Sequence, residues 1–321
     1  MRSGVVALKG FNVAKIPIFV WPYLAAVLLI GAGSLVSAEF GGANHILLLL
    51  GLASFTGLVA IGQTMVILLG GIDLSVSSTI TMAGVVSATI MAGSDSQIIP
   101  AVSAALLIGA AIGWVNGLGI GLLNIPPLVM TLGVTSLVQG LSLIYTNGAP
   151  KGNSAPLLSH LSTASLAGIP FMVIIWALIS LGVIFLLHRT TFGRWSYAVG
   201  HSPKAAHMSG VNVRLTIVSV YVISGFTAAL TGVLLTGYTK TSYLNIGDPY
   251  QMASIAAVVV GGTSILGGFG SYIGTIAGAI IITIIQSLLP ILSIPEAGRQ
   301  VISGLIILIL LLIYGRAKTN R

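Results

Sequence analysis

The sequence predicts an all-α, polytopic membrane protein with about ten transmembrane helices. Hydrophobic residues make up 56% of the 321 residues and charged residues only 6%, which leaves too little polar surface for a water-soluble domain of this size. The apolar residues fall into stretches of about 20, the length that crosses a bilayer as a helix. The 41 glycines fit close packing between membrane helices.

Ten apolar segments of suitable length can be marked between breaking residues. They cover residues 16–38, 45–69, 75–93, 98–122, 127–147, 169–188, 215–238, 250–266, 271–290 and 299–315. The eighth is the weakest, because the glycine cluster of Gly267, Gly268 and Gly270 follows directly after it, and this predicts a broken or partly re-entrant helix. In the fourth, glycines recur at every fourth position, at Gly109, Gly113, Gly117 and Gly121. This ladder on one helix face predicts a seam of close helix packing.

The placement of charge supports an even number of spans, with both termini on one side. Basic residues before the first span, after the last and in the connection of residues 189–214 all fall on that side: Arg2, Lys9, Lys15, Arg189, Arg194, Lys204, Arg214, Arg316, Lys318 and Arg321. The other side holds Glu39, Asp95, Asp248 and Glu296, with Lys151, Lys240 and Arg299. By the positive-inside rule, the basic side and both termini are cytoplasmic.

Several function classes are excluded by what the sequence lacks. There is no cysteine, hence no disulfide, thiolate metal site or cysteine nucleophile. The glycine-rich stretch 261–270 has no lysine and cannot act as a phosphate-binding loop, and no G-x-S-x-G motif occurs. The Lys and Arg residues form no basic run that would bind nucleic acid. We therefore predict no catalytic residue, no metal site and no cofactor. We expect membrane lipid to surround the protein.

The stretch GGIDLSVSS, residues 70–78, holds the only carboxylate between residues 40 and 94. Gly70 and Gly71 let the chain turn, and Asp73 or Ser75 is expected to cap the next helix at the cytoplasmic end of a hairpin. Two interpretations stay open: a helix cap alone, or a cap that also contacts a partner at the cytoplasmic face. A similar pattern of apolar lead, double glycine and closing Ala-Gly recurs at residues 257–278 and is compatible with an internal repeat.

The connection of residues 189–214 is the largest polar segment between spans. Its stretch SPKAAHMSG predicts a short helix that Ser202 caps, Pro203 begins and Gly210 ends. The residues between are compatible with a helix: Lys204, Ala205, Ala206, His207 and Met208. A helix this short is marginal alone, so we expect it to need a packing surface, which a docking partner would supply. The alternative is a solvated surface loop.

Four stretches of the chain resemble the ribose-type branch of ABC importer membrane permeases, which serve monosaccharides and related small polar solutes. They are TMVILLGGIDLSVSS (64–78), PPLVMTLGVTSLVQGLSLIYTNGAP (126–150), GRWSYAVGHSPKAAHMSGVNV (193–213) and SIAAVVVGGTSILGGFGSYIGTIAGA (254–279). The resemblance covers most of residues 45–315. The chain departs from the family pattern at Ser77, often a glycine, at Gln251 and Ala253, often acids, and at Phe269, often basic.

The resemblance implies one transmembrane permease domain over residues 1–321, multi-pass in the bacterial cytoplasmic (inner) membrane. The permease would work as a homodimer or paired heterodimer with a cytoplasmic ATP-binding subunit and a periplasmic or extracellular solute-binding protein. Loop 189–214 would carry a coupling helix toward the ATP-binding subunit, with candidate contacts at Gly200, Pro203, Lys204, Ala205, Ala206, Ser209 and Gly210. Such a permease contributes gating and no bond chemistry, so it is not an enzyme.

Two other classes are weighed against this one. An ion-coupled secondary transporter of a small polar solute would need no ATP and usually has an acid, a histidine or a broken helix near the midplane. A channel-like or structural subunit would need a ring of carbonyls or charges for selectivity, and none can be located in the sequence. Both are less favoured than the importer.

Overall fold

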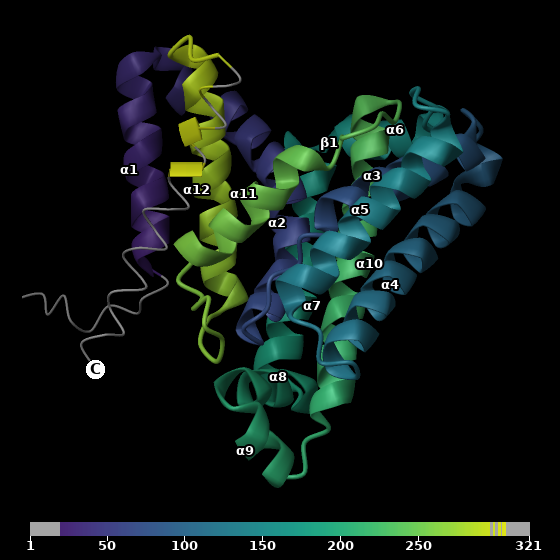
Figure 1. Cartoon of the computed structure of the whole chain (residues 1–321). Coiled ribbons are helices and arrows are strands. Elements are labelled where there is room, and N and C mark those ends of the chain that lie inside the picture. Colours follow the sequence, from purple (N-terminus) through teal and green to yellow (C-terminus); the bar gives the residue numbers. More distant parts are fainter. Residues whose placement is uncertain (1–19, 296–297, 299–300, 303, 306–321) are drawn as a thin grey trace, which may run out of the picture.

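The structure, a computed structural model, describes residues 20–295, 298, 301–302 and 304–305. The described part is helical apart from one small hairpin (Figure 1). The elements are α1 (Val20–Val36), η2 (Ala38–Gly41), α2 (Ala43–Leu68), α3 (Val76–Met91), η3 (Asp95–Gln97), α4 (Ile98–Gly121), α5 (Pro127–Thr146), α6 (Pro156–Thr163), β1 (Ser165–Leu166), β2 (Ile169–Pro170), α7 (Phe171–Arg189), α8 (Thr191–His201), α9 (Pro203–Met208), α10 (Val213–Thr239), α11 (Asp248–Val260) and α12 (Tyr272–Ile291). The all-α, polytopic prediction is confirmed.

The helices coincide with the predicted spans because apolar length and breaking residues set their bounds. Helices α2, α3, α4, α5, α7, α10 and α12 match their segments to within two residues at each end. Within the described residues, six helical segments are long and apolar enough to cross a membrane, and α1 and α3 are shorter apolar helices. The tenth predicted segment, 299–315, lies almost wholly outside the described residues.

The eighth predicted segment, 250–266, is the one whose bounds differ. Helix α11 has 13 residues, so it rises about 20 Å, less than the roughly 30 Å of a bilayer core. It ends at the glycine cluster, where Gly262, Gly267 and Gly268 have positive φ. The segment is therefore a shorter helix than predicted, and the chain runs through a loop of residues 261–271 before α12 begins. That it is broken or partly re-entrant in the membrane stays a prediction.

Helix α10 lies at the centre of the larger group of helices and packs against α4, α3 and α2 (Figure 1). The predicted glycine seam of α4 faces it. A Cβ atom on Gly109 or Gly113 would lie within 3.0 Å of the α10 backbone, at Gly225 and Tyr221. A Cβ on Gly225 would in turn meet the backbone of Gly109. The two backbones thus approach as closely as glycine allows.

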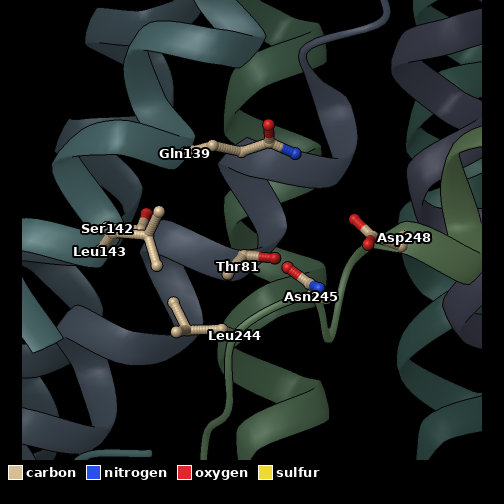
Figure 2. A pocket seen from close by; sticks show the side chains of 7 residues that line it. All are labelled: Thr81, Gln139, Ser142, Leu143, Leu244, Asn245 and Asp248. Atoms are coloured by element: carbon tan, nitrogen blue, oxygen red, sulfur yellow. The ribbon is translucent and has the colours of Figure 1, made fainter. Parts of the chain in front are cut away.

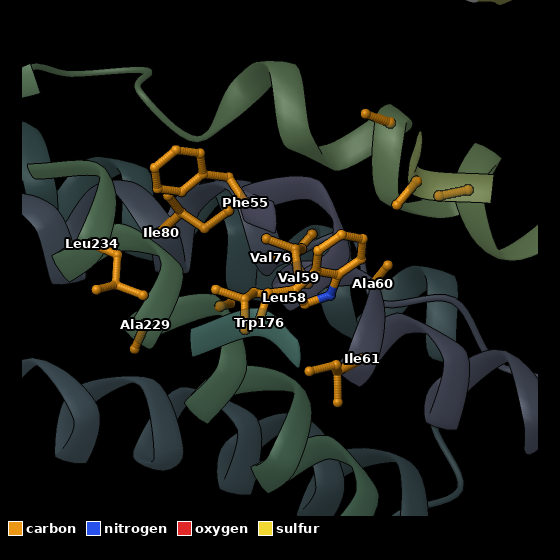
Figure 3. Packing of buried hydrophobic residues seen from close by; sticks show 14 of the residues in the cluster. Phe55, Leu58, Val59, Ala60, Ile61, Val76, Ile80, Trp176, Ala229 and Leu234 are labelled. Atoms are coloured by element: carbon orange, nitrogen blue, oxygen red, sulfur yellow. The ribbon is translucent and has the colours of Figure 1, made fainter. Parts of the chain in front are cut away.

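Helix α2 joins this group to a smaller one formed by α1, α11 and α12. It packs against α10 on one side and against α12 and α11 on the other. Its middle is wholly buried, and Figure 3 shows Phe55, Leu58 and Ile61 of α2 among the side chains of α3, α7 and α10. Trp176 of α7 lies in the same cluster and donates to the Tyr272 hydroxyl of α12, at 2.9 Å. The apolar core therefore runs through both groups.

The charges are sorted between the two ends of the bundle. Arg189, Arg194, Lys204 and Arg214 are exposed at the end that carries α8 and α9, the lowest part of Figure 1. Glu39, Asp95 and Asp248 are exposed on connections at or toward the opposite end, with Lys151 and Lys240. The remaining sorted charges lie outside the described residues: Arg2, Lys9, Lys15, Glu296, Arg299, Arg316, Lys318 and Arg321. We call the two ends the basic end and the acidic end.

Candidate functional site

The turn of residues 69–75 folds its only acid into the bundle. Asp73 is 1% exposed. Its Oδ1 accepts the N–H of Ser75 at 2.9 Å and the hydroxyl of Ser75 at 2.6 Å. Its Oδ2 accepts the hydroxyl of Ser224, on α10, at 2.7 Å. The amide of Asn116, on α4, donates to the Ser75 hydroxyl at 2.8 Å, so Asp73 connects the turn to α10 and Ser75 connects it to α4.

The predicted capping by Ser75 is wrong. Ser75 occupies the N-cap position of α3, but its side chain accepts no bond from the first helical turn. The physical reason is its helical backbone (φ −78°, ψ −5°), whereas a capping serine needs extended backbone to reach the next N–H groups. The Asp73 carboxylate takes the N–H and the hydroxyl of Ser75 instead.

The turn is also tied to α5. The hydroxyls of Thr131 and Thr135 donate to the carbonyls of Ile72, at 3.3 Å, and Leu74, at 3.0 Å. Ser224 lies eleven residues along α10, about 16 Å from its start, so Asp73 reaches well inside the bundle. These polar groups satisfy backbone carbonyls that an apolar interior would leave unpaired.

Burial limits what the turn can offer to a partner. Asp73, Ser75 and Gly71 are buried, whereas Gly70 is exposed. Gly70 has φ +80°, the left-handed conformation that glycine adopts without strain. The interpretation that the turn also contacts a partner stays a prediction. Because Gly70 is the exposed member of these four residues, such a contact would involve its backbone.

The connection of residues 189–214 folds as two helices, α8 and α9. The Ser202 hydroxyl caps α9 by accepting the N–H of Ala205 at 3.3 Å, Pro203 is its first residue, and Gly210 follows it with φ +83°. The helix predicted from SPKAAHMSG is therefore present with the expected start and stop signals.

The two faces of α9 differ. Ala206 is 4% exposed and packs with Val199 of α8 and with Val211. The other candidate contacts on α9 and after it are exposed: Pro203, Lys204, Ala205, Ser209 and Gly210. The expected need for a partner to supply the packing surface is thus corrected, because this chain supplies it. Ala206 belongs to the inner face, and the outer face is open.

Helix α8 was not predicted from the sequence, because it contains Gly193 and Gly200 and glycine is a weak helix former. Both glycines allow close approach: a Cβ on Gly193 would meet the backbone of Leu187, and one on Gly200 the carbonyl of Leu68. A usable signal was present. Gly193, Ser196 and Val199 recur at helical spacing and are buried, after Thr190, which caps α8 by accepting the N–H of Gly193 at 3.3 Å.

Three segments meet at the carbonyl of Leu68, the last residue of α2. It accepts the N–H of Gly268, from the loop of residues 261–271, at 2.8 Å. Gly200 of α8 lies against the same carbonyl. The hydroxyl of Tyr197, also on α8, donates to the carbonyl of Gly270 at 2.8 Å. We call this contact the Leu68 junction; it joins α8 to the end of α2 and to the loop before α12.

A polar cavity of about 280 Å³ lies beside α3 and α5 (Figure 2). Its lining comes from α3, α5, and the segment that leads into α11: Thr81, Gln139, Ser142, Leu143, Leu244, Asn245 and Asp248. Of these residues, the sequence pointed only to Asp248, as one of the charges on the side opposite the termini. In the described ranges, no three His, Cys, Asp or Glu side chains gather as a metal site would require.

Two departures from the family pattern contact each other. The Ser77 hydroxyl of α3 donates to Oε1 of Gln251 on α11, at 3.0 Å. Where the resemblance leads us to expect a glycine and an acid, this chain has a neutral hydrogen-bonded pair.

Comparison with known proteins identifies the family. A family model described as "Branched-chain amino acid transport system / permease component" matches residues 45–311. The chain is 32% identical to ribose import permease protein RbsC of Haemophilus influenzae over 95% of both chains. It is 35% identical to RbsC of Bacillus subtilis over 91% of both. It is 30% identical to D-allose transport system permease protein AlsC of Escherichia coli, over 88% of this chain and 86% of that one.

No solved structure matches the chain significantly. The family match spans more than half of the chain, and the apolar helices agree with a multi-pass protein of the bacterial inner membrane. The motifs that suggested the ribose-type branch fall within the matched region. The chain therefore belongs to the family of ABC importer permeases, among the permeases for sugar import.

Proposed function

We propose that this permease forms the translocation pathway for a monosaccharide or a similar small polar solute. The names of the relatives, which import ribose and D-allose, support this substrate class. ATP hydrolysis on a separate cytoplasmic subunit drives the pathway, and a periplasmic or extracellular solute-binding protein delivers the solute. A second permease subunit, identical or paired, completes the pathway.

The observation that carries the coupling proposal is the way α9 packs on one face and is exposed on the other. Helix α9 packs its inner face on Val199 and Val211 and leaves Lys204 and Ala205 exposed at the basic end. An exposed, capped helix on a small core of its own is a rigid docking element. The ATP-binding subunit contacts this outer face, and the Leu68 junction passes the displacement on to α2.

The topology completes the proposal. Residues 1–321 form one transmembrane domain with about ten spans and both termini in the cytoplasm. The sorting of exposed charge supports this, because the basic end then faces the cytoplasm. The loop of residues 189–214 is the coupling loop.

The test is affinity capture of the tagged permease from native membranes in mild detergent, followed by mass spectrometry. Ala205→Glu adds a charge and bulk to the outer face of α9 without entering the core. The matched control is Ala149→Glu, an exposed alanine between α5 and α6, at the acidic end. Ala206 is unsuitable for this test, because a charge there would disrupt the inner face of α9.

We expect the wild type and Ala149→Glu to bring down a Walker-type ATPase and Ala205→Glu to lose it. The main rival, an ion-coupled secondary transporter, is favoured by one observation, the buried carboxylate of Asp73. A wild-type permease that binds no ATPase, yet accumulates solute in ATP-free vesicles under an ion gradient, would establish that rival and reject the importer.

A further inference from the structure

One part of the cavity lining, the segment of residues 245–248, is held against α3 by its backbone. Gly247 presses against α3, where a Cβ atom would meet the carbonyl of Ser77 and the side chain of Ile80. The N–H of Gly247 also donates to the Thr81 hydroxyl at 3.2 Å. Asn245, two residues earlier, adopts φ +71°, which asparagine tolerates better than most side chains. The segment that supplies Asn245 and Asp248 is therefore held in place by backbone contacts.

Three exposed side chains present hydrogen-bonding groups to the cavity. Figure 2 shows Gln139 from α5, and Asn245 and Asp248 from the segment before and at the start of α11, around one space. Two amides offer donors and acceptors, and the carboxylate offers acceptors only. No Lys or Arg lines the cavity. This set suits the neighbouring hydroxyls of a neutral polyol; the carboxylate would repel an anion, and the amides would be left unpaired by an apolar solute.

Helix α5 exposes leucines as α7 does, at Leu132, Leu137 and Leu141, but next to the cavity it also exposes polar residues. The exposed middle of α7 carries only Ala177, Leu178, Leu181, Gly182 and Phe185. The exposed or half-exposed positions on one side of α5 include Gly133, Ser136, Gln139 and Gly140. A Cβ atom on Gly133 or Gly140 would meet nothing within 4 Å. A track of small and polar residues thus leads from the cavity along α5 in the direction of the basic end.

We propose that this cavity is a contact site for the solute on the acidic side of the pathway, where Gln139, Asn245 and Asp248 bind the hydroxyl groups of a monosaccharide. The inference rests on the proposed function and adds the residues that recognise the substrate. The volume of about 280 Å³ is at the small end of ligand sites, which start at roughly 300 Å³, and fits one sugar ring better than an oligosaccharide.

The first experiment measures uptake in proteoliposomes that contain the permease, its ATPase and its binding protein, with labelled D-ribose and D-allose as probes. The variants Asp248→Asn and Gln139→Leu remove a charge or the amide at nearly constant volume. The control Glu39→Gln makes the same kind of charge change at an exposed acid outside the cavity. Thermal stability and ATPase activity are measured on every sample.

At saturating binding protein, we expect uptake by Asp248→Asn and Gln139→Leu to fall about tenfold, the usual effect of losing one strong hydrogen bond. Stability and ATPase activity should stay at the level of Glu39→Gln. Wild-type uptake that needs ATP, together with cavity variants that transport as well as the control, would overturn this inference and leave the proposed function intact. A wild type that takes up neither sugar, or does so without ATP, counts against the proposed function itself.

A second experiment needs no sugar to be transported. The chain has no cysteine, so Gln139→Cys and Asn245→Cys each introduce a unique thiol, and Leu181→Cys gives a matched thiol on the exposed apolar surface of α7. A charged, membrane-impermeant thiol reagent applied from outside should label the two cavity positions and not residue 181. Cavity thiols that stay as unreactive as Leu181→Cys would mean that the site is sealed, and would reject it as part of the pathway.

Discussion

The turn of residues 69–75 and the loop of residues 261–271 are similar in sequence, and they touch, but they are built in opposite ways. The turn buries its polar side chains: Asp73 accepts a hydroxyl from α10, and hydroxyls of α5 donate to the carbonyls of Ile72 and Leu74. The loop leaves Leu266 and Phe269 exposed, each at 61%. It is held through its backbone, by the bond from Gly268 to Leu68 and the bond from Tyr197 to Gly270.

The difference shows that local sequence sets the backbone conformation of such a connection, whereas the neighbouring elements set which side chains are buried. Both connections use glycines at positive φ, Gly70 in the turn and Gly262, Gly267 and Gly268 in the loop, because tight reversals need that conformation. Whether the remaining residues are buried depends on what surrounds them. The turn is enclosed by membrane helices, whereas the loop lies at the end of the bundle against α8.

The largest effect should come from breaking the turn with Asp73→Ala. Two donors of Ser75 and the hydroxyl of Ser224 would lose their acceptor in a buried site, so we expect a loss of about 3–5 kcal/mol in the free energy of unfolding. The measurement is thermal unfolding of the detergent-purified protein, followed by fluorescence-detected size exclusion. Asp73→Asn keeps one oxygen acceptor and should lose less, and Glu39→Ala should lose almost nothing. Equal losses for Asp73→Ala and Glu39→Ala would contradict the buried network.

The second effect disturbs the Leu68 junction, where the loop meets the end of α2 just before the turn, with Gly200→Ala. The added methyl would run into the Leu68 carbonyl, and overpacking of this kind costs about 1–3 kcal/mol. We expect weaker coupling, seen as ATPase activity that continues while uptake falls. The control is Gly182→Ala on α7, where a Cβ would meet nothing within 4 Å. Uptake by Gly200→Ala at the level of this control would show that the junction transmits nothing.

A smaller effect tests how the loop is held. Tyr197→Phe removes the hydroxyl that donates to the Gly270 carbonyl at 2.8 Å, and should destabilise the protein by about 1 kcal/mol. The loop should become more accessible, which hydrogen exchange over residues 261–271 would detect. Tyr243→Phe, at an exposed tyrosine, is the control and should leave this exchange unchanged. If exchange in the loop is the same for both variants, other contacts hold it.

The smallest effect should follow Phe269→Lys, which restores the basic residue that the family often has there. Phe269 is 61% exposed, so the free energy of unfolding should change by no more than about 0.5 kcal/mol. Thermal unfolding of the purified variant measures this. A drop as large as that of Asp73→Ala would mean that the loop is packed like the turn, and would remove the contrast between them.

The elements that follow from local chemistry could be predicted from the sequence. Span bounds follow from apolar length, and α9 follows from Ser202, Pro203 and Gly210. The burial of Asp73 could not be predicted, because its partner Ser224 is 151 residues away. The orientation of Ala206 could not be predicted either, since its packing depends on Val199 and Val211 folding around it. The cavity was missed for the same reason, as its lining comes from three separate parts of the chain.

The bond between Asp73 and Ser224 also has a consequence for biosynthesis. Ser224 is made 151 residues after Asp73, and ribosomes add about 5–20 residues per second, so the carboxylate waits about 8 to 30 s for this partner. During that time α2 to α5 have been made, but the site between them still lacks α10. The early helices therefore cannot reach their final packing around Asp73 until α10 has been made.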